Sequence, residues 1–548
     1  MAEKKQNFLH GAILLTIAAA VVKLIGAFYK LPLQAAIGTV GYSYFTTAYD
    51  IYSVLLMVST AGLPVAMSRM ISQASALGHY NQVRRIYSVS KTIFLGIGIV
   101  STLLMMVGCH VLADALNQPD AWAAILCLGP CALLMGFIST YRGFFQGQGN
   151  MRPTSNSQMI EAVTKLLVGL TAAFAIMRLT NNVAFAAGGA ILGVTASCLV
   201  SAIYLRAKLG PEYRTLPRTG DEMRSFGATA KSLLAIAVPI TIGSAGLQLL
   251  NVVEVSLYMD RLVYLIGSNQ YMSQLVADGT TAQLAADSLK GIYDTARTVF
   301  NMPCAFIIPI TISVIPAITS NLTLGKDKEV RATEESAARI TGLLSLPCAV
   351  GLLILAAPVM SLLFGYEGYE RELAGQLMAV LGVNVFFYAV IQYTNSLLQS
   401  HGYAHVPVIN TLISGVMKVI VVYVLSGNPY IGILGAPIGA VACYVCISVL
   451  NLICVARLIP QKPRLVRNLL RPALSAAIMG VTVYLVHWGL SQFISADGGR
   501  GAQLVLCGGS IAVGVVVYFV CVVVLKAITK EDCMLLPKGD KIAKLLRL

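Results

Sequence analysis

Charged residues are scarce in this chain of 548 residues. Only 11% are Asp, Glu, Lys or Arg, against about 25% in a typical soluble domain, whereas 57% are hydrophobic. No polar stretch is long enough to cover the surface of even one water-soluble domain. These shortages exclude a water-soluble fold and predict that most of the chain faces lipid.

The common nucleotide-binding and hydrolytic motifs are also missing. The sequence has no Gly-x-x-x-x-Gly-Lys-Ser/Thr loop, no Gly-x-Ser-x-Gly elbow and no His-Glu-x-x-His. Many of the 12 cysteines lie inside apolar runs, so we interpret them as small hydrophobic residues rather than a disulfide framework. Cys443 and Cys446 have zinc-knuckle spacing, but no second pair lies nearby. We therefore expect no metal, no cofactor and no enzymatic activity.

Long apolar runs take the place of the missing polar surface. A bilayer core of about 30 Å needs about 20 residues of helix, and the short alternating strands of a membrane barrel are absent. The first run is of spanning length and lacks a small-residue cleavage site after it, so we expect it to stay as a helix. The sequence predicts an all-α polytopic membrane protein with fourteen spans at 8–29, 43–67, 88–112, 121–141, 155–177, 183–205, 231–257, 291–318, 337–363, 374–398, 406–426, 431–456, 471–494 and 503–525.

Lys and Arg are unevenly distributed among the connections between these spans. The net charge is +15, and most basic residues fall on the side of the two termini when the connections alternate sides. Only a few fall on the opposite side, namely Lys30, Arg178, Arg261, Lys290, Arg371 and Arg500. The positive-inside rule then predicts that both termini are cytoplasmic. Topology and contact with anionic membrane lipids explain the basicity, so no nucleic-acid partner is needed.

Three short patterns recur in the two halves of the chain at similar offsets. Leu77-Gly78 recurs as Leu324-Gly325, Gln146, Gly149 and Lys165 recur as Gln399, Gly402 and Lys418, and Gly189-Ala190 with Gly193 recurs as Gly435-Ala436 with Gly439. The paired glycines are typical of close helix packing. We predict two six-helix lobes related by an axis along the membrane normal, with a cavity between them. The domains would be an N-lobe at 1–210, a basic linker at 211–230, a C-lobe at 231–460, two added spans at 461–526 and a basic cytoplasmic tail at 527–548.

Ionisable residues inside the predicted spans form the candidate site. Each costs at least about 2.5–3.5 kcal/mol at membrane depth, so each calls for an explanation. One interpretation is that they only neutralise one another, since Glu161 and Lys165, and Asp294 and Arg297, are local pairs on one helix face. The other is that they line a wet cavity, where bases hold an anionic group and acids provide proton or ion coupling. The bases are Lys23, Lys165, Arg297 and Lys418, and the acids are Asp50, Glu161, Glu254 and Asp294.

One segment resembles a known family. Arg142-Gly143-Phe144-Phe145-Gln146-Gly147, followed by Asn150-Met151, Pro153-Thr154, Gln158 and Glu161, resembles the fourth-to-fifth connection of the stage V sporulation protein B and Gram-positive lipid II flippase group. This group belongs to the multidrug/oligosaccharidyl-lipid/polysaccharide (MOP) exporter superfamily. Leu9-His10-Gly11-Ala12 with Lys23, and Gly62-Leu63-Pro64-Val65-Ala66, look like the same group.

The resemblance implies a flippase of the bacterial plasma membrane. Its substrate would be a polyprenyl-pyrophosphate-linked oligosaccharide precursor, and lipid II of peptidoglycan is the favoured candidate. The flippase would move this lipid from the cytoplasmic to the outer leaflet by alternating access. Lys23 falls at a basic position of the first span thought to hold the pyrophosphate, and Arg297 lies near the one in the eighth span. Arg142 lies on the predicted cytoplasmic rim, where it would either meet the substrate or anchor the loop to anionic lipid.

Several other functions remain open at this point. The substrate could be another envelope polysaccharide or a spore-cortex precursor. A cation-coupled multidrug exporter of the same superfamily would favour acidic over basic cavity residues, which Lys23, Lys165 and Lys418 oppose. A glycosyl polymerase would need catalytic acids on an outer loop, and a scaffold for envelope assembly would not transport at all.

Overall fold

The computed structural model describes residues 2–57, 63–220, 222–268, 281–460, 463–494 and 499–529. Within these ranges every regular element is a helix and no strand occurs. The predicted tail at 527–548 lies outside the described residues beyond position 529. Two compact units, 1–291 and 292–548, divide the chain within the helix α9 (Ala282–Thr323).

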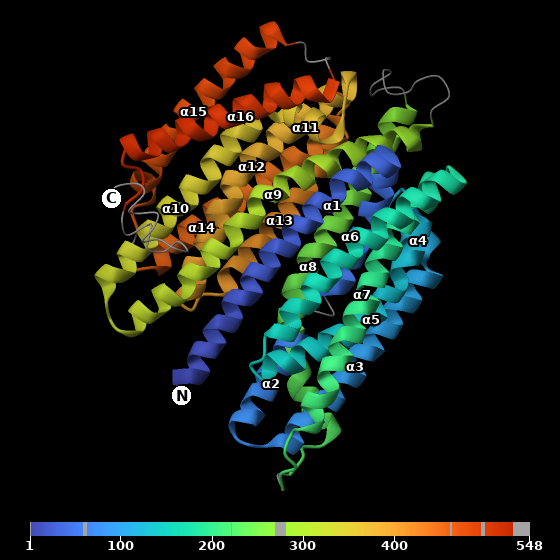
Figure 1. The fold of residues 1–548 in the computed structure, drawn as a ribbon, viewed down its shortest axis with the longest axis vertical. Coiled ribbons are helices and arrows are strands. Elements are labelled where there is room, and N and C mark those ends of the chain that lie inside the picture. Colours follow the sequence, from blue (N-terminus) through green and yellow to red (C-terminus); the bar gives the residue numbers. More distant parts are fainter. Residues whose placement is uncertain are drawn as a thin grey trace. The chain divides into compact units, whose positions relative to one another are not determined.

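The first unit contains the helices α1 to α8 and the start of α9 (Figure 1). Their bounds are α1 Ala2–Met57, α2 Leu63–Ala76, α3 Tyr80–Val107, α4 Cys109–Ala115, η2 Pro119–Ala121, α5 Trp122–Gly147, α6 Arg152–Thr180, α7 Val183–Arg214, α8 Phe226–Gly267 and α9 Ala282–Thr323. Helix α7 packs against both α5 and α6, and α3 packs against α5.

The second unit contains the rest of α9 and the helices α10 to α16. Their bounds are α10 Asp327–Ile354, α11 Ala356–Phe364, α12 Gly368–Ser400, α13 His405–Ser426, η3 Gly432–Leu434, α14 Gly435–Leu458, α15 Leu465–Phe493 and α16 Gly499–Val524. Helix α12 packs against α10 and α14, whereas α15 packs against α10 and α16.

Ten helices of the described chain are long and apolar enough to cross a membrane. Each overlaps a predicted span: α3, α5, α6, α7, α10, α12, α13, α14, α15 and α16. The predicted spans 88–112 and 337–363 are each divided in the structure, because α3 ends at Val107 before α4 and α10 ends at Ile354 before α11. Their outward faces carry large exposed apolar side chains, such as Val516 and Val520 on α16. Such apolar surfaces are unfavourable in water and favourable in the hydrocarbon core of a bilayer. The protein is therefore an all-helical, multi-pass membrane protein.

The first two predicted spans differ from the structure. Residues 30–42, expected as a connection, belong to the single helical element α1, which continues past Pro32 and is broken at Gly38. Gly38 has φ 69° and ψ −178°, a conformation that essentially only glycine adopts. The chain carries no charge between Lys30 and Asp50, so nothing favours an extended polar loop there. The described part of α1 reaches Met57 and α2 begins at Leu63, so residues 58–62 of the predicted span 43–67 lie outside the described residues.

The recurring glycines of α7 and α14 lie where helices of one unit approach closely. A Cβ atom on Gly193 of α7 would overlap the backbone of Gly169 on α6, and one on Gly439 of α14 would overlap the Val422 side chain on α13. Packing within the chain thus explains both glycine pairs. Gly291 has a similar role, because a Cβ there would overlap the carbonyl oxygen of Thr39 on α1.

Candidate substrate-binding site

Lys165 lies in the middle of α6, and aromatic rings flank its ammonium group. The Nζ atom is 5.7 Å from the ring centroid of Tyr29 and 5.9 Å from that of Tyr49, both on α1. The side chain is half-buried. A ring face attracts a cation but does not neutralise it. No carboxylate of the described residues forms an ion pair with Lys165, so its positive charge is available to an anion.

Glu161, which the spacing predicts to share a face with Lys165, pairs instead with Arg142 of α5. Its Oε1 lies 3.1 Å from Arg142 Nη2, and the two side chains are 13% (Arg142) and 21% (Glu161) exposed. Arg142 Nε also donates to Ser157 Oγ at 2.9 Å. An arginine has several donors in one plane and can hold two acceptors at once. The pair joins α5 to α6 and leaves Lys165 without that carboxylate.

The other predicted residues of the first unit lie on α1 and α8. Asp50 is half-buried, and its main-chain oxygen accepts a hydrogen bond from Ser53 Oγ at 2.7 Å. Ser53 also donates to Gln248 Oε1 of α8 at 3.2 Å. Glu254 of α8 is buried, with 4% of its surface exposed. The backbone of Lys23 belongs to α1, but its side chain lies outside the described residues.

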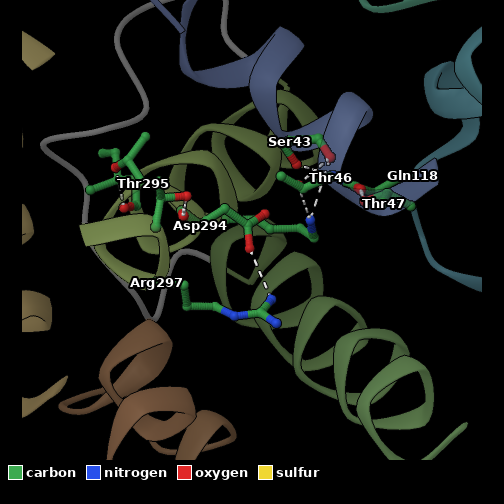
Figure 2. A network of polar contacts seen from close by, with 10 residues as sticks. Ser43, Thr46, Thr47, Gln118, Asp294, Thr295 and Arg297 are labelled. Atoms are coloured by element: carbon green, nitrogen blue, oxygen red, sulfur yellow. Dashed lines mark hydrogen bonds and ion pairs between the residues drawn. The ribbon is translucent and has the colours of Figure 1, made fainter. Parts of the chain in front are cut away.

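The second unit contains three of the predicted residues. Arg297 Nη1 lies 3.1 Å from Asp294 Oδ1, as their spacing on one helix face predicts (Figure 2). Arg297 is 33% exposed and also lies over the ring of Tyr293, whereas Asp294 is 2% exposed. Lys418 is half-buried on α13, next to the glycine contact with α14.

A buried polar cluster at the start of α9 was not predicted. Lys290, assigned from the sequence to an outer connection, is fully buried. Its Nζ donates to Thr46 Oγ1 at 3.0 Å and to the main-chain oxygen of Ser43 at 3.4 Å. Figure 2 shows Ser43 and Thr46 beside Thr47 and Gln118.

Asp287, one turn before Lys290, completes this cluster. Its carboxylate accepts from Gln118 Nε2 at 2.8 Å, Tyr44 Oη at 3.0 Å and Gln283 Nε2 at 3.1 Å. The sequence offered one signal: Asp287, Lys290, Asp294 and Arg297 alternate in sign at spacings of three and four residues. That spacing places all four on one helix face.

The fold and these buried charges define a class, the polytopic membrane proteins with ionisable residues inside the helix bundle. A family model described as "Polysaccharide biosynthesis protein" matches residues 8–322, more than half of the chain. The chain belongs to this family.

Relatives of full length support the assignment. The chain is 26% identical to the uncharacterized membrane protein YabM of Bacillus subtilis (strain 168), over 99% of this chain and 97% of that protein. It is 25% identical to stage V sporulation protein B of the same organism, over 97% and 98%. It is 23% identical to the lipid II flippase MurJ of that organism, over 94% and 95%.

Solved structures of a flippase and of a multidrug transporter share the fold. The lipid II flippase MurJ in an inward closed conformation matches with a TM-score of 0.67 and 13% identity, covering 93% of this chain and 98% of that one. An inward-facing multidrug resistance transporter of the MATE family matches with a TM-score of 0.62 and 15% identity, covering 81% and 99%. These likenesses show a shared fold, and the family model confirms that the chain belongs to a polysaccharide biosynthesis family. The relatives and neighbours named here by activity are flippases and transporters rather than enzymes, as predicted for this chain.

Proposed function

We propose that this protein is a flippase for a polyprenyl-pyrophosphate-linked glycan precursor. The observation that carries the proposal is Lys165, a cation inside a spanning helix that no described carboxylate neutralises. A lone charge at that depth is costly, and a diphosphate headgroup would supply the missing negative charge. Relatives named as a lipid II flippase and as a sporulation protein support a lipid-linked substrate.

The remaining bases would act by exchanging partners. Arg142 and Arg297 are held by Glu161 and Asp294 in this structure. A diphosphate offers more charge and more acceptor oxygens than one carboxylate. An arginine guanidinium can bind a phosphate group through two parallel hydrogen bonds. Binding of the substrate would thus free Glu161 and Asp294 from their arginines, and each acid could then take up a proton or ion. Asp50 and Glu254 would bind protons or ions in the same way. Lys23 and Lys418 would contact the pyrophosphate from the first and eleventh predicted spans.

The proposed transport cycle needs the predicted topology. We propose fourteen spans, with six-helix lobes at 1–210 and 231–460, a linker at 211–230, added spans at 461–526 and both termini in the cytoplasm of a bacterial plasma membrane. A cavity between the lobes would shield the sugar and peptide from lipid, while the polyprenyl tail stays in the bilayer. Lipid II for peptidoglycan is the favoured substrate, and a sporulation or other cell-wall precursor is the alternative.

Reconstitution tests the proposal directly. Full-length protein is placed in proteoliposomes with fluorescent lipid II, and the fraction reaching the opposite leaflet is measured. Losing a charged contact worth about 1.5–3 kcal/mol corresponds to roughly a 10- to 100-fold loss, so Lys165→Gln should reduce flipping by that factor. Arg178→Gln is the matched control, because Arg178 is an exposed basic residue at the end of the same helix. Wild-type rates in the Lys165→Gln variant would overturn the assignment.

A second experiment separates the substrates. The endogenous lipid II flippase of a Gram-positive host is depleted, and growth and outer-leaflet lipid II are measured with this gene supplied. Rescue supports lipid II as the substrate. Correct membrane insertion without rescue would favour another polyprenyl-linked glycan, and export of cationic drugs without lipid flipping would favour a multidrug exporter.

A further inference from the structure

Glu334 and His401 form a buried pair within the second unit. Glu334 lies in the second turn of α10, and His401 directly follows the last residue of α12. His401 Nε2 is 2.8 Å from Glu334 Oε1, and the side chains are 6% (His401) and 0% (Glu334) exposed. The other carboxylate oxygen, Glu334 Oε2, is buried without a hydrogen-bond partner among the described residues.

The surroundings of the pair are largely apolar. Val330 and Ala338 of α10 pack with Leu397 and Leu398 of α12 in one cluster, which Val314 and Ile318 of α9 and Val455 of α14 extend. The titratable side chains packed here are Tyr393, Tyr403 and Cys454. Tyr393 donates its hydroxyl to the main-chain oxygen of Glu334 at 3.1 Å, not to the carboxylate.

The charged side chains close to Glu334 along α10 have other partners. Glu335 Oε1 lies 3.1 Å from Arg331 Nε and accepts from the main-chain N–H of Arg464 at 3.2 Å. Arg339 donates to Asn468 at 3.0 Å. Among the described residues, His401 is therefore the one ionisable partner of the Glu334 carboxylate.

Charge balance decides what such a pair can bind. With one shared proton the pair has no net charge, whether the proton lies on the imidazole or on the carboxylate. Losing that proton leaves a carboxylate in apolar surroundings without a counter-charge, and a second proton leaves an imidazolium without one. Both states are strongly disfavoured while the pair stays buried.

The first half of the chain shows that packing alone does not require a titratable pair. The repeat that aligns Gln146 with Gln399, and Gly149 with Gly402, aligns Gln148 with His401. Gln148 donates through its amide to Ser75 Oγ at 3.1 Å. An uncharged hydrogen bond thus serves at the corresponding position of the first half. A purely structural pair would also be expected to satisfy both carboxylate oxygens.

We propose that Glu334 and His401 form a proton-binding site that couples proton movement to transport. The site holds one proton when the ends of α10 and α12 are closed, and releases it to water when those ends separate. This inference rests on the proposed flippase function, since it requires the protein to alternate between conformations. The proton is its ligand, and neither residue needs to contact the lipid-linked substrate.

A transport experiment with an imposed pH difference tests the coupling. Flipping of fluorescent lipid II by full-length protein is measured in proteoliposomes with and without the gradient. Wild type should respond to the gradient, whereas Glu334→Gln and His401→Gln should lose the response and keep gradient-free flipping. Glu335→Gln is the matched control, since it removes the adjacent acid. An unresponsive wild type, or a full response in both Glu334→Gln and His401→Gln, would overturn the coupling.

A substrate-independent measurement distinguishes failure of the site from failure of the flippase assignment. The chain has only 6 histidines, so nuclear magnetic resonance of protein labelled with 13C-histidine can follow each imidazole. The His401 signal is the one missing in His401→Gln. Its pH dependence should change in Glu334→Gln and stay as in wild type in Glu335→Gln. An unchanged pH dependence in Glu334→Gln would overturn the site, whereas a changed one without lipid II flipping would overturn only the flippase.

If Glu334→Gln does not fold, Glu334→Asp replaces it as the test variant. The shorter acid retains the charge but cannot span the same distance to the imidazole. It should therefore alter the His401 signal and weaken the gradient response without abolishing it. A wild-type signal in Glu334→Asp would count against direct proton sharing.

Discussion

The ammonium group of Lys165 lies between two tyrosine rings, 5.7 Å from the centroid of Tyr29 and 5.9 Å from that of Tyr49. The rings stabilise the charge without cancelling it. Tyr29 is further fixed by its hydroxyl, which donates to the main-chain oxygen of Ala190 on α7. The cation is therefore positioned by apolar groups and left with its full charge.

Replacing one ring should weaken transport moderately. A cation–π contact at a part-exposed site contributes about 0.5–1 kcal/mol, or roughly 2- to 5-fold in affinity. Tyr49→Leu should lower the apparent affinity for fluorescent lipid II by that factor, whereas Tyr49→Phe, which keeps the ring, should stay near wild type. Equal affinity in Tyr49→Leu and wild type would show that the ring does not position the cation.

The Arg142–Glu161 ion pair should stabilise the first unit only as long as both partners are present. Both side chains are largely buried, so removing one leaves the other charge without compensation, at a cost of about 3 kcal/mol or less given their partial exposure. Glu161→Gln should lower the melting temperature of the detergent-solubilised protein. The double variant Arg142→Met/Glu161→Leu should recover much of that loss. A single variant as stable as wild type would contradict this account.

The two glycine contacts should differ in their tolerance of a methyl group. On Gly193 the added Cβ would overlap backbone, which cannot move aside without shifting α6 from α7. On Gly439 it would overlap one methyl group of the Val422 side chain, which can shift with less change to the backbone. Overpacking costs about 1–3 kcal/mol, so Gly193→Ala should lower the melting temperature more than Gly439→Ala. Gly96→Ala on α3, where nothing lies within 4 Å, is the control.

The spanning helices could be predicted because their signal is compositional. A run of about 20 apolar residues in a membrane must satisfy its own backbone hydrogen bonds, and an α-helix does this. Ten predicted spans therefore overlap helices of the structure. The path from Lys30 to Asp50 lacks such a signal. Its polar residues, such as Gln34 and Thr47, are uncharged and buried by neighbours distant in sequence, and this allows α1 to continue.

The candidate site could be predicted by residue type but not by partner. Asp294 pairs with Arg297 as their spacing predicts, whereas Glu161 pairs across helices with Arg142 rather than with Lys165 four residues away. Local spacing identifies which charges share a face, but tertiary packing decides which of them meet. Lys290 shows the limit most clearly, because its partner Thr46 is 244 residues away.

The cluster around Asp287 yields a last prediction, on the stability of the first unit. Gln118, Tyr44 and Gln283 all donate to this carboxylate, which is almost fully buried. An asparagine has one acceptor oxygen, and its amide group would face a donor. Leaving a buried donor unsatisfied costs about 1–3 kcal/mol, so Asp287→Asn should lower the melting temperature measurably.

Asp260→Asn is the control for this substitution, because Asp260 is exposed on α8. It should leave the melting temperature within error of wild type. The same scan on Lys290→Met tests the contribution of the lysine to the cluster. Methionine fills a similar volume but removes the donor to Thr46 and Ser43, together with the positive charge near Asp287. If Asp287→Asn and Lys290→Met both have the melting temperature of the wild type, the cluster does not hold the start of α9 against α1.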